Sequence, residues 1–196
     1  MDDTELALAL ARDVDTGFAS LLAAHQDRIY SITLRILANH ADAEEAAQDT
    51  FVRAYRALLG YSAARIRDLA LRPWLATIAV NACRNRRRRP SDRRPALSLG
   101  PLVEAGFEPR DPGLSVEALG ERSGDIETWA RRLAAVPRGQ RTAIVLRHVD
   151  GLTYPEIAAA LGLPEGTVKA QVHRGLRRLR EHLEPEGARR REELSA

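Results

Sequence analysis

The amino-acid sequence predicts an all-α protein made of two small helical domains joined by a flexible linker. Apolar residues recur at three- and four-residue spacing from about residue 16 to residue 183, and no stretch alternates as a strand would. Residues 90–125 contain five prolines and five glycines and show no period. With 196 residues, 44% hydrophobic and 29% charged, the chain can form one or two small cores. We therefore expect domains at 16–89 and 126–183, a linker at 90–125 and a charged tail at 184–196.

The first helix is expected to run from about Phe18 to Asn39. Its apolar stripe consists of Phe18, Leu21, Leu22, His25, Ile29, Ile32 and Ile36. His25 falls on or beside this stripe, where a histidine at the margin of the core is the ordinary interpretation and a ligand contact the rarer one.

The second helix is expected to begin near Asp42, whose carboxylate can cap the free amides of the first turn. Its buried face would hold Ala43, Ala47, Thr50, Phe51, Ala54 and Leu58. The opposite face would hold Glu45, Asp49, Val52 and Arg56, with Gln48 and Arg53 beside them. A mixed-charge face of this kind is typical of plain solvated surface, and a partner contact is the alternative.

The third helix is expected from about Pro73 to Arg89, with proline in the first turn, where it is tolerated. Leu75, Ile78, Ala79 and Ala82 would face the core. The other side carries Trp74, Thr77, Asn81, Arg84, Asn85 and Arg88, and the helix ends in four consecutive arginines. Rings stack on unpaired bases, amides bond to base edges and arginines hold phosphates, so this stripe suits single-stranded nucleic acid. Half-buried packing is the alternative for Trp74.

The C-terminal domain has the pattern of a helix-turn-helix. Two apolar segments precede it, one of Trp129, Leu133 and Val136 and one of Ala143, Ile144, Leu146 and Val149. Thr153 and Glu156 then form a capping box before a short helix, which Gly162 ends. A short helix, a glycine turn and a basic helix from about Glu165 to Leu183 follow the arrangement in which the second helix enters the major groove.

The last helix separates into two faces. Val168, Val172, Leu176, Leu179 and Leu183 form the apolar face. The candidate DNA-contacting residues are Thr167, Lys169, Ala170, His173, Arg174 and Arg177. His173 has arginines as neighbours on its face, which favours DNA contact over a plain surface histidine.

The charge distribution supports nucleic acid as a partner. The net charge is only +3, but residues 61–95 have ten basic and two acidic side chains (+8), and residues 129–183 have ten and four (+6). Such basic segments are typical of phosphate-backbone binding, although a solvated arginine face has the same composition.

The sequence argues against catalysis, cofactors and membrane insertion. A single cysteine, Cys83, excludes an intramolecular disulfide and a zinc site with two thiolates. No glycine-rich phosphate loop, metal-ligand cluster or nucleophile motif is visible. The start of the chain does not resemble a secretory signal, and no run approaches the roughly 20 apolar residues needed to cross a bilayer. We expect a cytoplasmic protein that is not an enzyme and has no metal.

Three motifs in this order resemble the extracytoplasmic-function group of bacterial RNA polymerase sigma factors. They are DAEEAAQDTFVRAYRAL at 42–58, WLATIAVN at 74–81 with Asn85, and GLTYPEIA at 151–158 with GTVKAQVHR at 166–174. The resemblance spans about residues 16–183 and implies that the two domains correspond to sigma domains 2 and 4.

The resemblance implies partners for each face. The helix at 42–58 would dock on the clamp helices of core RNA polymerase through Glu45, Gln48, Asp49, Arg53 and Arg56, while the C-terminal domain touches the polymerase flap. The melted minus-ten element of promoter DNA would be held by Tyr61, Trp74, Asn81, Arg84, Asn85, Arg86, Arg87 and Arg88. The helix-turn-helix residues would read the minus-thirty-five element. An anti-sigma factor is a further implied partner.

The sequence departs from the family in two places. The loop Ser62 to Arg72 is longer than usual, and Ala170 and Gln171 stand where serine and arginine are frequent. Promoter base preference therefore does not carry over. The main alternative is a helix-turn-helix regulator with an N-terminal sensing or dimerisation domain, which would bind duplex DNA without polymerase, whereas a free sigma factor binds it weakly. Oxidation of Cys83 and simple burial of its thiol also remain as alternatives.

Overall fold

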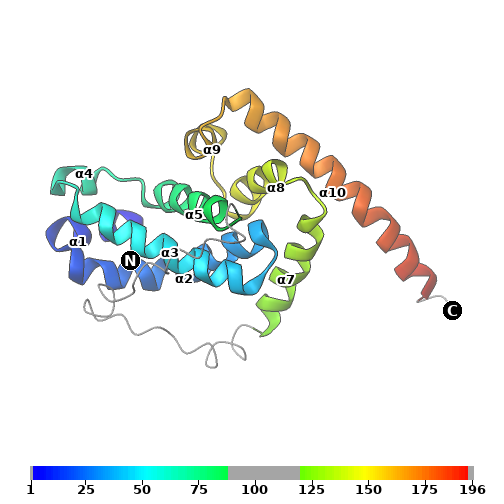
Figure 1. Ribbon diagram of the computed structural model, residues 1–196, viewed down its shortest axis with the longest axis horizontal. Helices are drawn as coiled ribbons and strands as arrows, with labels where there is room; N and C mark the ends of the chain where they lie inside the picture. The colour runs from blue at the N-terminus through cyan, green and yellow to red at the C-terminus, as the bar shows by residue number, and fades with distance from the viewer. Residues whose placement is uncertain (1, 88–119, 194–196) are drawn as a thin grey trace.

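The computed structural model describes residues 2–87 and 120–193 (Figure 1), and the regular elements in these ranges are helices. The N-terminal bundle consists of α1 (Asp3–Arg12), α2 (Val14–Leu37), α3 (His40–Leu59), α4 (Ala63–Arg67) and α5 (Leu71–Arg87). The C-terminal bundle consists of α7 (Gly120–Ala134), α8 (Arg138–Ile144), the π-helical turn η2 (Val145–Val149), α9 (Tyr154–Leu161) and α10 (Glu165–Glu193). The prediction of an all-α fold is confirmed. Most of the linker expected at 90–125 lies outside the described residues, and its last six residues already belong to α7.

Helix α1 was not expected from the sequence. It begins with a capping box in which the amides of Asp2 and Glu5 each donate to the other's carboxylate, at 3.0 and 2.8 Å. Its buried leucines pack on α2 where Gly17 allows the two backbones to touch, because a Cβ at Gly17 would lie 2.7 Å from the amide nitrogen of Leu10. The N-terminal segment is therefore part of the bundle.

Two expectations for α3 are corrected. Its N-cap is Asn39, whose side chain accepts from the Asp42 amide at 2.9 Å, so the cap is not Asp42. The reason is that the chain leaves α2 through Ala38 at φ 54° and becomes extended at Asn39, which is where a cap must sit. Val52, expected on the outer face, is 2% exposed because α2 and α5 both pack on α3 and widen its buried side. The predicted inner face is buried, with Thr50 and Phe51 at 0% and 4% exposure.

The helix-turn-helix forms as the sequence predicts. Thr153 and Glu156 make the capping box, with the Thr153 amide donating to Glu156 Oε2 at 2.7 Å. Gly162 ends α9 in the left-handed conformation at φ 65°. Val149, expected in the apolar segment, is the last residue of the π-helical turn and is 42% exposed. Helix α10 continues past Leu183 to Glu193, into the segment expected to be a charged tail.

The two bundles pack directly against each other (Figure 1), with α2 against α7 and α5 against α9. Their apolar side chains join one continuous buried cluster. Arg141 of α8 is buried and donates to the carbonyls of Ile36 at 3.0 Å and Ala134 at 2.6 Å, which ties the last turns of α2 and α7 together. The sequence predicted two domains, and the structure adds that they are in contact.

His25 predicts a pH dependence of stability. It is 5% exposed, neither ring nitrogen makes a hydrogen bond within the described residues, and its Nε2 lies 3.3 Å from a carboxylate oxygen of Asp3. Burial lowers the pKa of His25, although Asp3 opposes this effect. The unfolded chain therefore binds more protons, so stability is complete above the ordinary pKa near 6.5 and declines as the pH falls below it.

The free energy of unfolding, measured in urea, is expected to fall between about pH 7.5 and about pH 5.5. The fall should be larger for the wild type than for His25→Gln, which has no imidazole to titrate. Equal losses in both proteins would show that His25 does not set the pH dependence.

Candidate nucleic-acid interface

Helix α5 presents the polar stripe that the sequence predicted. It begins at Leu71, two residues early, and buries Leu75, Ala79 and Ala82, with Ile78 partly covered. Asn81, Arg84, Asn85 and Arg86 are exposed, whereas Trp74 and Tyr61 are half-buried. The side chain of Arg87 and all of Arg88 lie outside what the structure describes. The stripe thus offers amides and guanidinium groups to solvent beside a partly covered aromatic pair.

The aromatic pair brings together two separate segments of chain. The Tyr61 ring, after α3, lies 6.3 Å from the Trp74 ring at a tilt of 56°. The guanidinium of Arg65 in α4 lies 3.7 Å over the Tyr61 ring centroid. Sequence reasoning missed Arg65, because α4 is a single turn within a loop and gave no periodic signal. A guanidinium plane on a ring occupies the position that a stacked base would take.

Two arginines of α5 have partners within the protein. Arg84 donates to Asn81 Oδ1 at 3.4 Å and to the carbonyl of Leu161, in the C-terminal bundle, at 3.3 Å. Arg86 pairs with Asp42 at 3.3 Å and with Glu45. Exposed pairs of this kind contribute at most about 1 kcal/mol, so a phosphate could replace them.

The outer face of α3 is polar along its length. Glu45, Gln48 and Arg56 are exposed, and Asp49 and Arg53 are half-buried and form an i,i+4 pair with 2.7 Å between Nε and Oδ2. The Arg86 pairs join this face to the end of α5. The five residues expected to meet one partner therefore share one surface, which adjoins the stripe of α5.

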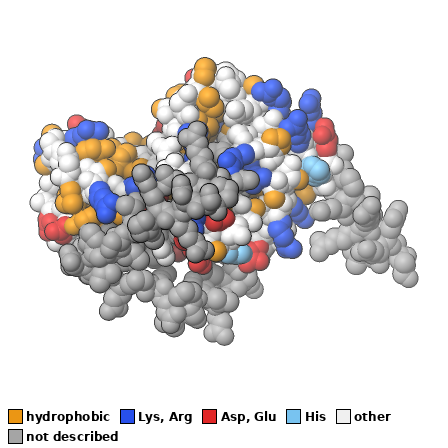
Figure 2. All heavy atoms as spheres, in the orientation of Figure 1, with side chains coloured by type: hydrophobic (Ala, Val, Ile, Leu, Met, Phe, Trp, Pro, Cys, Tyr) orange, Lys and Arg blue, Asp and Glu red, His pale blue; other side chains and the backbone are white. Residues whose placement is uncertain are grey.

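The second helix of the helix-turn-helix presents a basic face. Lys169, His173, Arg174 and Arg177 are exposed, and Thr167 and Ala170 are half-buried. In Figure 2 Lys and Arg side chains gather on the side of the molecule along which α10 runs. Lys169 Nζ donates to Glu165 Oε1 at 2.6 Å, and this hydrogen bond raises the pKa of Lys169, so this side chain stays charged.

A second aromatic contact borders this basic face. The cationic groups of Arg147 and Lys169 lie 5.0 and 5.5 Å over the ring of Tyr154, the first residue of α9. Arg147 also donates to the carbonyl of Leu152 at 3.0 Å. Sequence reasoning missed Arg147 and Tyr154, because their proximity depends on how η2 meets α9. The positive surface therefore extends from α10 to the start of α9.

Helix α10 crosses α8 at very short range. A Cβ built on Gly175 would lie 2.6 Å from Ile144 Cδ1, and Gln171 packs over Gly139. Gln171, which departs from the family pattern, thus faces α8 and not the outer side of α10. This close crossing fixes the direction in which the basic face points.

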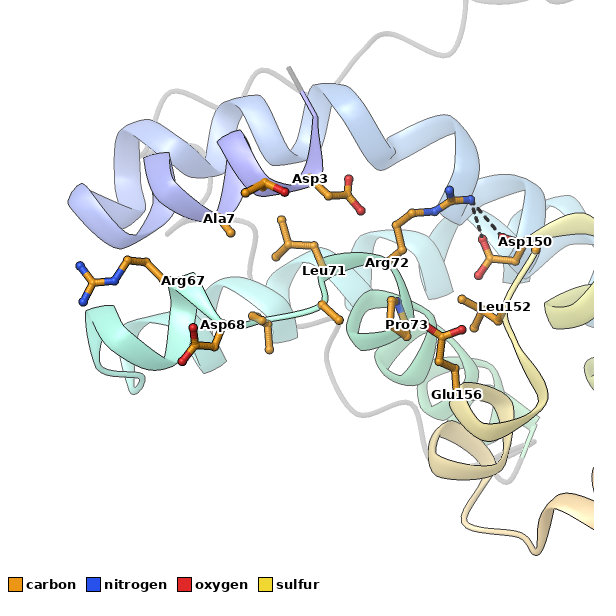
Figure 3. A pocket seen from close by; sticks show the side chains of 14 residues that line it. Asp3, Ala7, Arg67, Asp68, Leu71, Arg72, Pro73, Asp150, Leu152 and Glu156 are labelled. Carbon is orange, nitrogen blue, oxygen red and sulfur yellow. Dashed lines mark hydrogen bonds and ion pairs between the residues drawn. The ribbon is translucent and has the colours of Figure 1, made fainter.

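An open cleft of about 390 Å³ lies where the two bundles meet (Figure 3). Residues of α1, the segment before α5 and the loop after η2 line it, and Figure 3 shows Arg72 reaching toward Asp150 across it. The lining carries side chains of both charges. Among the described residues there is no group of three metal-ligating side chains, and none of their helices is long and apolar enough to span a membrane.

The single cysteine is deeply covered. Cys83 on α5 is 2% exposed, and burial raises the pKa of its thiol to about 12. A thiol with such a pKa is almost wholly protonated at neutral pH, and the thiolate is the reactive form. Cys83 is therefore a buried, unreactive side chain in this structure.

Comparison with known proteins gives consistent matches in both bundles. The model of Sigma-70 region 2 matches residues 21–94, and that of Sigma-70, region 4 matches residues 126–179. The chain is 32% identical over 177 residues to the ECF RNA polymerase sigma factor SigW of Bacillus subtilis, covering 85% of this chain and 89% of that protein. It is 30% identical over 191 residues to the RNA polymerase sigma-H factor of Pseudomonas aeruginosa, covering 93% and 94%.

Solved structures show the same fold. The structure of CnrH in complex with the cytosolic domain of CnrY matches with a TM-score of 0.64 and 25% identity, over 93% of this chain and 97% of that one. The sigma factor RpoE in complex with the anti-sigma factor NepR from Bartonella quintana matches with a TM-score of 0.61 and 24% identity, over 85% and 96%.

Proposed function

The chain belongs to the extracytoplasmic-function group of the sigma-70 family, whose members bind core RNA polymerase and direct it to promoters. We propose which surface of this chain binds the polymerase and which surfaces bind each promoter element. Residues 16–89 act as sigma domain 2 and residues 126–183 as sigma domain 4, joined by the linker at 90–125. The protein catalyses no reaction and acts by binding its partners. Its place of action is the cytoplasm, where RNA polymerase works.

The outer face of α3 docks on the clamp helices of the polymerase, and the C-terminal bundle touches the flap. The contacts are Glu45, Gln48, Asp49, Arg53 and Arg56. Their common exposure on one helix face supports this assignment. The Arg86–Glu45 pair links this face to the stripe of α5, so docking can release a phosphate-binding arginine.

The stripe of α5 holds the melted minus-ten element. Asn81 and Asn85 bond to base edges, Tyr61 and Trp74 stack with unpaired bases, and Arg84 with Arg86, Arg87 and Arg88 holds phosphates. Unstacking a base step costs a few kcal/mol, and stacking on an aromatic ring returns about 1 to 3 kcal/mol per base. The proximity of the Tyr61 and Trp74 rings supports this role.

The basic face of α10 reads the minus-thirty-five element in the major groove. The observation that carries the proposal is that α9, its glycine turn and α10 form a complete helix-turn-helix whose exposed residues include Lys169, Arg174 and Arg177. Thr167, Lys169, Ala170, His173, Arg174 and Arg177 make this contact. An anti-sigma factor is a further partner, as it is for the RpoE structure that shares this fold.

The decisive experiment is run-off transcription on a genomic fragment library, with core polymerase from a G+C-rich bacterium, in the presence and absence of the protein. We expect new start sites that depend on the protein and reveal both promoter elements. If no start sites appear and the free protein instead binds specific duplex DNA tightly, the chain acts as an ordinary helix-turn-helix regulator.

Arg174→Ala is expected to lower promoter binding by the holoenzyme about tenfold or more, because one good base contact by arginine is worth about 1–3 kcal/mol. The measurement is competition between promoter fragments in a gel-shift assay. Arg131→Ala, which removes an exposed arginine from α7, serves as the matched control. Equal promoter affinities of the holoenzymes with the two variants would show that Arg174 does not contact the promoter.

A further inference from the structure

The guanidinium group of Arg65 covers one face of the Tyr61 ring, the ring that the proposed function assigns to an unpaired base. Its central carbon lies 3.7 Å from the ring centroid, which is a stacking distance. The side chain of Arg65 is exposed, and no oxygen of residues 2–87 and 120–193 forms a hydrogen bond or an ion pair with this guanidinium. Its N–H donors are therefore available to a ligand that approaches the ring.

The backbone holds the ring and the arginine in a fixed relation. The Tyr61 amide donates to the Leu58 carbonyl at 3.0 Å, at the end of α3, and the Arg65 amide donates to Ser62 Oγ at 3.3 Å, at the start of α4. The next residue, Ile66, is 2% exposed, and α4 packs against α1. The side chain of Arg65 can therefore move while its backbone stays beside the ring.

A base that stacks on this face of Tyr61 must displace the guanidinium. Stacking of a base on an aromatic ring is stronger than an exposed cation–π contact, so the displacement is favourable. Because the backbone of Arg65 stays in place, its side chain moves only as far as the rim of the ring. A planar pair of N–H donors then faces the edge of the stacked base.

We propose that Arg65 is a specificity-determining residue that selects a base with two adjacent hydrogen-bond acceptors at the minus-ten position stacked on Tyr61, an inference that rests on the proposed function. Guanine offers such a pair in N7 and O6, the usual partners of an arginine. Cytosine offers N3 and O2 on its Watson–Crick edge, which is accessible in an unpaired base. Adenine places an amino donor beside its acceptors, and thymine places an N–H group between its two carbonyls, so neither accepts both bonds.

A sequence-independent contact with a phosphate is the alternative role for Arg65. The stacked position favours base selection, because the guanidinium starts from the place that the base takes, whereas phosphates lie outside a stack of bases. Glutamine separates the two roles, since its amide pairs with N6 and N7 of adenine. Arg65→Gln should therefore change the preferred base if Arg65 reads a base. If Arg65 holds a phosphate, the same substitution should weaken binding equally for every base.

The experiment is run-off transcription by the holoenzyme from a promoter library randomised over the minus-ten element, with sequencing of the transcribed promoters. For the wild type we expect one position at which guanine or cytosine is favoured over adenine and thymine about five- to hundredfold. Arg65→Ala should lower this preference to less than about twofold and leave the other positions unchanged, and Arg65→Gln should favour adenine there. Arg67→Ala removes an exposed arginine from the same short helix and should keep the wild-type profile.

The favoured base identifies which acceptor pair Arg65 meets. Where it is guanine, a synthetic promoter with a guanine analogue that has carbon in place of N7 tests the contact directly. The analogue should reduce open complexes formed by the wild type and leave those formed by Arg65→Ala unchanged. An equal reduction in both proteins would show that Arg65 does not bond to N7.

A wild-type base preference in both Arg65 variants would overturn the proposal, and so would a loss of transcription that is equal for every sequence. A wild-type protein that yields no start sites would contradict the proposed function instead. Binding of fluorescent single-stranded pentanucleotides to the free chain, with guanine, cytosine or adenine as the central base, would then decide the role of Arg65. Tighter binding of guanine or cytosine that Arg65→Ala abolishes would support base selection, and equal affinities in the wild type would refute it.

Discussion

Arg53→Glu on the outer face of α3 is expected to lower the affinity for core RNA polymerase about ten- to hundredfold, because like charges opposed across an interface cost several kcal/mol. Arg53 is half-buried and held by Asp49 at 2.7 Å, so its guanidinium has a defined position. The substitution also places two carboxylates side by side, which adds local repulsion on the same face. The measurement is titration of labelled protein with core enzyme.

Arg12→Glu makes the same change of charge on the exposed end of α1 and is the matched control. It should bind polymerase as the wild type does. Because an exposed i,i+4 pair contributes only about 0.3–0.5 kcal/mol, the melting temperature of Arg53→Glu should change little. If Arg53→Glu bound polymerase normally, the docking face would lie elsewhere.

Trp74→Ala is expected to reduce the amount of open promoter complex about five- to hundredfold. The reason is that stacking of one base on an aromatic ring contributes about 1–3 kcal/mol, and this variant loses one such contact. Reactivity of unpaired thymines to permanganate measures opening. Trp74→Phe should restore much of it, because a ring remains beside Tyr61. Binding of the holoenzyme to the minus-thirty-five element should be unaffected, since the proposed contact with that element is made by α10, which is distant in sequence from Trp74.

The second tryptophan offers the control for Trp74. Trp129 on α7 is 39% exposed, so Trp129→Ala removes an equal ring from the surface. It should open promoters normally. Trp74 also packs on the core of its bundle, so unfolding free energies must be compared. A loss of opening that followed the loss of stability in both Trp74 variants would make Trp74 a packing residue only.

Much of the candidate site could be predicted because its signals are local. The helical period put Glu45 and Arg56 on one face of α3, and Asn81 and Asn85 on one face of α5. Val52 was misplaced, since periodicity gives the centre of a buried face and not its width, which depends on how many helices pack on it. Arg65 and Tyr154 could not be foreseen, because their ring contacts join residues from different elements.

The sequence by itself determined most of the helices, although not α1 or α4, and it determined the capping box at Thr153, the turn at Gly162 and the basic face of α10. Each of these depends on residues within a few positions of one another, so local geometry is enough. The tertiary structure alone decided that α1 docks at Gly17 and that Arg28 meets Asp150, 122 positions along the chain. An ion pair across that separation has no local pattern, because it arises only when two complete bundles pack and enclose a charge that each would otherwise expose to water.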